Sequence, residues 1–271
     1  MIGEPGQPRY QVTVGRYGTR IGRRSEIYLN HHLYGRDDAP LAMDYFVWLI
    51  RNETTTIVVD TGFSRDGGRK RGRELLVDPP ELFASMGVHA ADEPLVAITH
   101  AHYDHIGNLS HFSRSRVVIA RRETEFATGP YVTRTLFHHS FEDDEIAELV
   151  SVREQGRLHE FDDEIELAPG VRMFRTGGHT PGQSMITVPT SVGVVLLASD
   201  ALHYQEELDL NMPFSSVAEL IPMYATFDRI REMTEAGVVD HVVAGHDPST
   251  LQSLAPFASR TTELTVELGE L

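Results

Sequence analysis

The stretch Thr99-His100-Ala101-His102-Tyr103-Asp104-His105-Ile106-Gly107 contains four potential metal ligands within six residues, in the pattern His-x-His-x-Asp-His. At the extended end of a strand, side chains two residues apart point the same way, so His100 and His102 share one side. Asp104 and His105 follow in a turn that Gly107 can tighten. One such cluster cannot complete the coordination of two ions, so other parts of the chain must supply further ligands.

Three later turns offer the missing ligands. They are His179 in the sequence Gly-Gly-His-Thr-Pro-Gly, Asp200 in Ala-Ser-Asp-Ala, and His246 in Ala-Gly-His-Asp-Pro. Each of these residues comes directly after a short apolar run that has the composition of a strand. Loops at neighbouring strand ends meet at one edge of a sheet pair, so we expect these residues to converge on the first cluster.

Strand-like and helix-like stretches alternate along the whole chain. The runs 45–50 and 54–59, separated by a short polar turn, predict a β-hairpin. Further strands are predicted at 95–98, 117–120, 171–174, 184–188, 192–198 and 242–244, and helices at 79–86 and 217–234. No Gly-x-Gly-x-x-Gly motif follows the early strands, which argues against a doubly wound sheet. We therefore expect one domain, residues 1–271, built as a two-sheet sandwich with outer helices.

The composition limits the chemistry and the partners. The chain has 271 residues, no cysteine and a formal net charge of -16. Without thiolates, a metal must be held by imidazole and carboxylate groups, which suits zinc, manganese, iron or cobalt. A surface this acidic repels phosphate backbones, so we expect no nucleic-acid partner. No apolar run approaches the length of a membrane span and no signal peptide is visible, so we expect a cytoplasmic protein that does not bind membranes.

One basic segment stands apart from the acidic average. It runs from Arg65 to Arg73 and carries five cationic residues among glycines. The simplest interpretation of this segment is a solvated loop. The alternative is that it contacts an anionic substrate or a partner.

At the ligand motifs the chain strongly resembles the metallo-β-lactamase-fold hydrolases, and most of all the N-acyl-homoserine lactonase group. The resemblance rests on Asp60 in an Asp-Thr-Gly turn, on the 100–105 cluster, and on His179, Asp200 and His246, in the family's order. It implies an α/β (α+β) fold, an αββα sandwich of the metallo-β-lactamase type, with a dinuclear metal site at one edge. It also implies a homodimer.

The resemblance assigns a role to each ligand. It places His100, His102 and His179 on a first divalent ion and Asp104, His105 and His246 on a second, with Asp200 bridging them. Zinc is the ion expected. The implied reaction is the opening of a lactone ring, most simply that of an N-acyl-homoserine lactone in quorum quenching, by a metal-bridging hydroxide, with Asp104 passing a proton to the leaving alkoxide.

The chain departs from some lactonases at one position. Three residues after the bridging aspartate those enzymes place a tyrosine that reaches the substrate carbonyl, whereas this chain has His203, followed by Tyr204. Either side chain could supply the hydrogen bond to the developing oxyanion, or the substrate differs. A thioesterase, a phosphotriesterase, and a lactonase for another small lactone are therefore kept as alternatives, as is a non-catalytic binding protein with the same fold.

Several other residues have both a structural and a functional interpretation. Asp60 either orients a ligating imidazole or caps its own turn. The loop segment 129–141 interrupts the helical pattern and is a candidate lid. The pairs His31–His32 and His138–His139 are either ordinary core or surface residues or part of a substrate-pocket wall. The stretch Met212-Pro213-Phe214 either faces the substrate or packs in the core.

Overall fold

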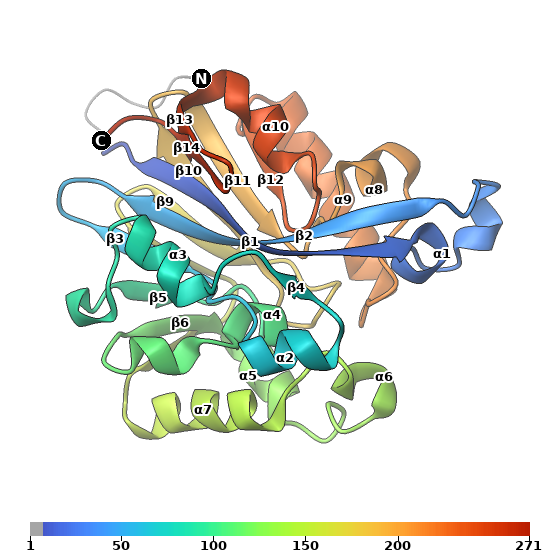
Figure 1. Cartoon of the computed structure of the whole chain (residues 1–271), viewed down its shortest axis with the longest axis horizontal. Helices are drawn as coiled ribbons and strands as arrows, with labels where there is room; N and C mark the ends of the chain where they lie inside the picture. The colour runs from blue at the N-terminus through green and yellow to red at the C-terminus, as the bar shows by residue number, and fades with distance from the viewer. Residues whose placement is uncertain (1–7) are drawn as a thin grey trace.

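The computed structural model of the chain describes residues 8–271. Its strands form two sheets that pack face to face, and helices cover the outer side of each sheet (Figure 1). In Figure 1, α5 and α7 lie below β5 and β6, whereas α10 lies above β1 and β2. The predicted α/β (α+β) fold, an αββα sandwich, is confirmed.

The first sheet has the strand order β13-β14-β1-β2-β3-β5-β6-β7, with β4 paired to β1. The second has the order β12-β11-β10-β9-β8. The strands of the first sheet are β1 (Gln11–Arg23), β2 (Pro40–Arg51), β3 (Thr56–Val59), β4 (Glu74–Leu75), β5 (Leu95–Ala97), β6 (Val117–Ala120), β7 (Leu158–Phe161), β13 (Ala258–Thr261) and β14 (Thr265–Leu268). Those of the second are β8 (Glu164–Ala168), β9 (Val171–Arg175), β10 (Ser184–Thr190), β11 (Gly193–Ser199) and β12 (His241–Ala244).

The helices lie in the connections between strands. The α-helices are α1 (Arg24–Ile27), α2 (Arg65–Lys70), α3 (Pro79–Ser85), α4 (Tyr103–Ile106), α5 (Arg121–Ala127), α6 (Thr135–His138), α7 (Asp143–Glu154), α8 (Gln205–Leu210), α9 (Leu220–Glu235) and α10 (Thr250–Leu254). The 3-10 helices are η1 (His31–Tyr34), η2 (Ala90–Asp92), η3 (Leu109–Phe112) and η4 (Ala255–Phe257).

Three apolar layers hold the sandwich together. The central layer lies between the sheets and includes Trp48 of β2 and Ile186 of β10. A second layer packs α3 and α7 on the outer face of the first sheet, and a third packs Phe227 of α9 on β11. Burial of this apolar surface contributes roughly 25 cal/mol per Å² and fixes the relative position of the two sheets. The loops at their shared edge are therefore set on a rigid frame.

Strand direction explains why the predicted ligands meet. Strands β3, β5 and β6 are parallel, so the turns after them lie at the same edge of the first sheet. Strands β11 and β12 are parallel in the second sheet, so Asp200 and His246 follow them at one edge of that sheet. His179 lies in the loop between the antiparallel strands β9 and β10. The predicted strands are thus observed with shifts of a few residues at their ends.

The sequence prediction omitted the long strand β1. Its pattern is interrupted by glycines, which weaken the signal of a strand. The structure gives a packing reason for one of them, because a Cβ at Gly18 would lie 2.8 Å from the ring of Phe63. The register of β1 on β2 shifts between Arg16 and Gly18, which is a β-bulge. This irregular strand forms one wall of the cavity described below.

A buried carboxyl group joins α7 to the start of α2. Ser64, at the N-terminus of α2, accepts a hydrogen bond from the Gly67 amide and donates one to Glu145. Burial, together with the neighbouring carboxylate of Glu142, raises the pKa of Glu145 to about 8. The fold therefore favours the protonated form of this side chain.

This pKa predicts a pH dependence of stability. A carboxyl group with a raised pKa stabilises the fold fully below its unfolded value, and this contribution is lost as the pH rises through about 8. Glu145→Gln should remove the dependence. From pH 6 to 8 the free energy of unfolding of the wild type should fall relative to that of Glu145→Gln, with a slope of at most about 1.4 kcal/mol per pH unit.

Denaturant titration of the metal-loaded proteins at each pH measures this difference. Asp144→Asn, which removes an exposed carboxylate from the same helix, is the matched control. Parallel pH profiles for the wild type and Glu145→Gln would contradict the prediction.

Candidate metal centre

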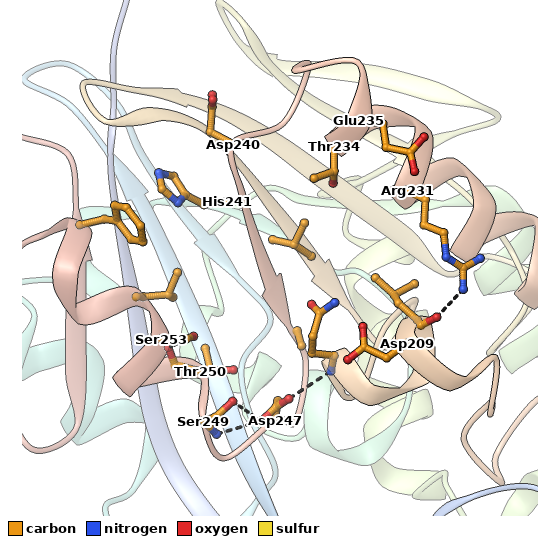
Figure 2. Close-up of a pocket in the computed structure, with 16 residues that line it drawn as sticks. Asp209, Arg231, Thr234, Glu235, Asp240, His241, Asp247, Ser249, Thr250 and Ser253 are labelled. Atoms are coloured by element: carbon orange, nitrogen blue, oxygen red, sulfur yellow. Dashed lines mark hydrogen bonds between the residues drawn. The ribbon is translucent and has the colours of Figure 1, made fainter. Parts of the chain in front are cut away.

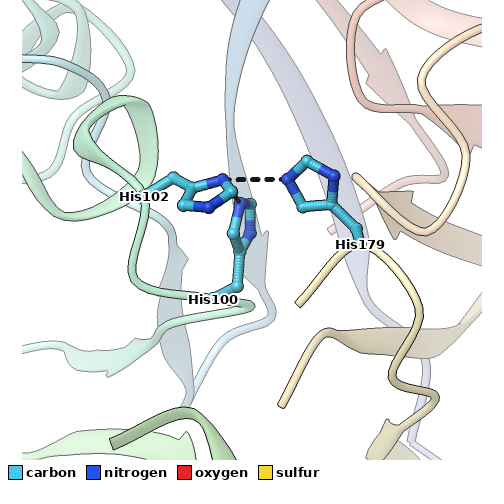
Figure 3. Close-up of side chains that lie close together, drawn as sticks. All are labelled: His100, His102 and His179. Carbon is cyan, nitrogen blue, oxygen red and sulfur yellow. Dashed lines mark hydrogen bonds between the residues drawn. The ribbon is translucent and has the colours of Figure 1, made fainter. Parts of the chain in front are cut away.

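All seven predicted ligands are buried and lie together at the edge shared by the two sheets. The first group brings His100 and His102 from the first sheet against His179 from the second (Figure 3). His102 Nδ1 lies 3.0 Å from His100 Nε2 and 2.9 Å from His179 Nε2. Three imidazole nitrogens that face one another at this spacing match the donor arrangement of a tetrahedral metal site.

A second group lies beside the first. Asp104, His105 and His246 each offer one ligand atom, and these atoms lie within 4.8 Å of one another. Asp104 Oδ2 is 3.7 Å from His246 Nε2, and its Oδ1 is 3.9 Å from His105 Nε2. Each group thus combines two ligands from the segment that runs from the end of β5 into α4 with one distant histidine.

Asp200 stands between the two groups. Its Oδ1 is 3.2 Å from His246 Nε2 and 3.3 Å from His105 Nε2, both in the second group. Its Oδ2 is 3.3 Å from His179 Nε2, in the first group. Its Oδ2 also lies 3.3 Å from His246 Nε2, so the carboxylate reaches both groups, which is the placement that a bridging ligand needs.

The outer nitrogens of the ligating rings are fixed by acceptors. His179 Nδ1 donates to the Ser216 carbonyl at 2.7 Å, and His246 Nδ1 donates to the Asp44 carbonyl at 2.8 Å. A carbonyl can only accept, so the proton lies on Nδ1 and the Nε2 lone pair of each ring faces the centre. These hydrogen bonds orient both rings without the help of a bound ion.

Asp60 orients a third ring and ties two loops together. Its buried carboxylate lies 2.7 Å from His105 Nδ1. The same carboxylate accepts hydrogen bonds from the Thr99 amide at 2.8 Å and the Thr99 hydroxyl at 2.7 Å. The structure thus shows the predicted contact between Asp60 and the imidazole of a candidate ligand.

Burial keeps three of the rings neutral. Desolvation lowers the pKa of His100 and of His102 well below the ordinary 6.5, and it lowers the pKa of His179 to about 3. The neutral imidazole is the form that binds a metal ion. His105 Nε2 and Asp200 Oδ1 are buried and make no hydrogen bond within residues 8–271. The donors present therefore fit two divalent ions held by nitrogen and oxygen.

Glu123, which the sequence analysis missed, is hydrogen-bonded to the two loops that carry candidate ligands, one from each sheet. We call this set of contacts the Glu123 clamp. The buried Glu123 carboxylate accepts hydrogen bonds from the amides of Ala101 at 2.9 Å and Gly182 at 3.0 Å, and from the Thr180 hydroxyl at 2.6 Å. Ala101 lies between two ligands and Thr180 follows a third. No local motif marks this glutamate, because its partners are distant in sequence.

His203 and Tyr204 lie beneath the site. His203 Nε2 is 3.1 Å from Asp200 Oδ2, its Nδ1 is 3.3 Å from a Glu207 carboxylate oxygen, and its ring stacks on Phe214. Tyr204 is 2% exposed, and its hydroxyl donates to the Ala42 carbonyl at 3.1 Å. Neither side chain lines the cavity that opens onto the ligands.

That cavity has a volume of about 410 Å³, within the range of small-molecule sites. The ligands His102, Asp104, His179, Asp200 and His246 form its floor. Its walls are Arg20, Glu26, Met43, Tyr45, Arg71, Arg73, Tyr103, His139, Ser140, Phe214, Ser215 and Ser216. Of these wall residues, Tyr45 on β2 had no sequence signal, because it reads as an ordinary apolar strand residue.

The structure assigns some residues of the loop 129–141 and of the pair His31–His32 to the cavity and others to the core or the surface. In the loop 129–141, His139 and Ser140 line the cavity, whereas His138 is exposed and paired with Asp143. His31 is buried beside Tyr28, and His32 is exposed.

In the stretch 212–214 and in the basic segment 65–73, some residues face the cavity and others do not. Met212 is core, and Phe214 faces the cavity. In the basic segment, Arg71 and Arg73 face the cavity, whereas Arg65, Arg69 and Lys70 lie on the surface.

A larger cavity of about 620 Å³ lies along the edge strand β12, between α8, α9 and α10 (Figure 2). Asp247, one residue after a ligand, lines it and accepts a hydrogen bond from the Gln205 amide. None of the seven candidate ligands lines this cavity. The smaller cavity is therefore the candidate reaction site.

The Glu123 clamp predicts a loss of metal affinity without a change in any ligand. Glu123→Gln keeps the shape of the side chain but replaces one acceptor oxygen with an NH2 donor. Loss of such outer partners typically weakens metal binding about 10- to 100-fold. Competition with a chromophoric chelator measures the affinity, and Glu125→Gln, at an exposed position of the same helix, is the control. Unchanged affinity in Glu123→Gln would show that the clamp does not position the ligands.

Comparison with known proteins agrees with this geometry. The profile of the metallo-beta-lactamase superfamily matches residues 43–246. N-acyl homoserine lactonase of Bacillus cereus is 25% identical over 224 residues, covering 76% of this chain and 82% of the relative. N-acyl homoserine lactonase AiiB of Agrobacterium fabrum is 28% identical over 225 residues, covering 76% and 80%. Bovine acyl-coenzyme A thioesterase MBLAC2 is 25% identical over 224 residues, covering 74% and 72%.

Solved structures show the same fold. The crystal structure of a quorum-quenching N-acyl homoserine lactone lactonase superposes with a TM-score of 0.75 at 19% identity, covering 91% of this chain and 96% of that one. AidC, a dizinc quorum-quenching lactonase, superposes with a TM-score of 0.69 at 17% identity, covering 98% and 96%. With the family profile spanning the chain from β2 to the last candidate ligand, this protein belongs to the metallo-β-lactamase superfamily of hydrolases.

Proposed function

We propose that this protein is a dinuclear metal-dependent lactonase that opens the ring of an N-acyl-homoserine lactone. The observation that carries the proposal is the position of Asp200 between two complete ligand groups, on the floor of a cavity of small-molecule size. The names of the bacterial relatives support the choice of substrate. A cytoplasmic location and a homodimeric state remain predictions from the sequence.

The donor set favours zinc, because imidazole and carboxylate ligands in compact groups suit that ion. His100, His102 and His179 would hold one ion, and Asp104, His105 and His246 the other, with Asp200 shared. Bound divalent ions supply a water of lowered pKa as nucleophile and polarise the ester carbonyl.

The chain's own residues complete the chemistry. Asp104 lines the cavity with its carboxylate at the floor, where it can accept the proton that the attacking water gives up and pass it to the alcohol oxygen that leaves when the ring opens. Tyr45 stands beside it on the wall, with its ring 5.0 Å from that of His246. The Tyr204 hydroxyl donates to the Ala42 carbonyl, and neither Tyr204 nor His203 lines the cavity. The Tyr45 hydroxyl faces the weak sulfur acceptor of Met43, at 3.7 Å, so we propose Tyr45 as the donor to the developing oxyanion.

His203 then has a positioning role. Its Nε2 lies beside Asp200, and Glu207, which is fully buried, lies on its other side. The nearby Asp200 and Glu207 carboxylates outweigh desolvation, which lowers the value, and raise the pKa of His203 to about 9. A protonated ring held in this way would fix the orientation of the bridging carboxylate.

Single substitutions identify the oxyanion donor. Tyr45→Phe should lower kcat by about a hundredfold or more, because the loss of one such donor typically costs about 2.7–4 kcal/mol in the barrier. Tyr204→Phe should lower it only a few-fold. Steady-state kinetics on N-hexanoyl-homoserine lactone makes the comparison, with circular dichroism to check the fold. A large loss in Tyr204→Phe together with a small one in Tyr45→Phe would reverse the assignment.

The metal content tests the centre itself. Mass spectrometry of the purified protein should find close to two transition-metal ions per chain, and removal by a chelator should abolish lactone hydrolysis until metal is restored. Asp200→Ala should lower the metal content, because it removes a ligand that faces both groups. A fully active protein with no bound metal would refute the proposed function.

A thioesterase is the second candidate, favoured by the bovine relative named an acyl-coenzyme A thioesterase. A thioester carbonyl can be attacked at the same centre. Assays of lactones beside thioesters and aryl phosphotriesters separate these candidates. Inert lactones with a reactive thioester would replace the lactonase while leaving the hydrolase.

A further inference from the structure

One wall of the metal cavity is cationic, although the chain carries a net charge of -16. Arg20 lies on β1 and Arg73 directly precedes β4, which is antiparallel to β1. The register pairs Gly18 with Leu75 and Thr19 with Glu74, and its extension by one residue places Arg73 opposite Arg20. Both side chains are partly buried and both line the cavity.

In the described part of the chain, this arginine pair has no carboxylate partner within ion-pairing distance. Among residues 8–271, neither guanidinium forms an ion pair within 4.0 Å, and both instead contact neutral groups. Arg20 Nε lies 3.2 Å from Met43 Sδ. Arg73 Nε lies 3.2 Å from the Tyr103 hydroxyl, and its Nη1 donates to the Arg71 carbonyl at 2.6 Å.

The neighbouring Arg71 shows what a structural arginine looks like in the same place. Its guanidinium pairs with Glu142, donates to the carbonyls of His139 and Phe141, and lies over the Tyr103 ring at 4.0 Å. These contacts use its donors to hold the loop 129–141 in place. The donors of the arginine pair are not used in this way.

Two like charges facing each other across a strand pair destabilise it unless an anion lies between or beside them. Glu26 also lines the cavity, but its carboxylate accepts a hydrogen bond from the Arg23 amide and forms no ion pair with Arg20 within 4.0 Å. Bound divalent ions at the floor would add positive charge to the same space. An anionic group on the substrate would offset the positive charge of the two guanidiniums and of the ions at the floor.

We infer that the substrate of this enzyme carries an anionic group, a carboxylate or a phosphate, which the Arg20 and Arg73 guanidiniums bind on the wall beside Tyr45. The inference rests on the proposed function, because it places an ester at the floor of the same cavity. The cavity of about 410 Å³ suits a lactone with a short acidic side chain. An acyl chain without charge would leave the pair unpartnered.

A matched pair of lactones tests the inference. N-adipoyl-homoserine lactone ends in a carboxylate where N-hexanoyl-homoserine lactone ends in a methyl group. The wild type should show a kcat/KM about tenfold or more higher for the adipoyl compound, since a hydrogen bond to a charged group is among the stronger ones. Arg20→Gln and Arg73→Gln, made singly, should each reduce this ratio about fivefold or more. Arg122→Gln, at an exposed position on α5, should keep the ratio of the wild type.

A binding experiment keeps the result independent of turnover. Calorimetry of the metal-loaded protein with the ring-opened products, N-adipoyl-homoserine and N-hexanoyl-homoserine, should give the same preference in Kd and the same loss in the two variants. If neither lactone is hydrolysed, the proposed function fails, and the binding preference still decides the role of the arginine pair.

A second pair of compounds identifies the source of the anion. Hexanoyl-coenzyme A carries phosphates that the hexanoyl thioester of N-acetylcysteamine lacks. A preference for the coenzyme A compound that both variants lose would assign the pair to phosphate, whereas a preference within the lactone pair assigns it to carboxylate. No preference in either pair, or preferences that both variants retain, would overturn the inference.

Discussion

The carboxylate of Asp60 is the contact on which the metal centre depends. It is fully buried at the end of β3, where it accepts two hydrogen bonds from Thr99 and faces the Nδ1 of His105. The Thr99 hydroxyl also lies 2.8 Å from that of Ser199, the last residue of β11. One carboxylate thus joins the ends of β3 and β5 and, through Thr99, reaches the second sheet. A buried network of this kind is stable only when every member has its partner.

The backbone around this network is constrained as well. Asp60 and Ser199 both have positive φ, 57° and 47°, a region that non-glycine residues rarely adopt. Each precedes or forms part of a turn that delivers ligands, and the hydrogen bonds to Thr99 hold both turns in place. Backbone strain of this kind persists only where the surrounding structure determines it, and it gathers at functional sites. The apolar core layers that pack against the two sheets hold these turns in their strained conformation.

The sequence predicted which residues meet at the candidate site because each follows a short apolar strand in a compact motif, so that local order and strand direction suffice. It predicted the sandwich through the same motifs. It missed β1, whose glycines allow close packing against Phe63 and hide the strand pattern.

The sequence pointed to His203 and Tyr204, close to Asp200 in the chain, as candidate oxyanion donors. The tyrosines that line the cavity are Tyr45 on β2 and Tyr103 in α4, which lie far from Asp200 in the sequence. Which arginines of the basic segment face the cavity depends on the register of β4, and no sequence pattern reveals that register.

The division of the ligands between distant segments has a consequence for the order of assembly during synthesis. The group formed by His100, His102 and His179 has all its members once the polypeptide has been extended to the β9–β10 loop. The group of Asp104, His105 and His246 must wait for almost the whole chain to emerge. The first group of ligands is therefore present in the chain before the second is complete, so a polypeptide that stalls between these points would carry only the first group.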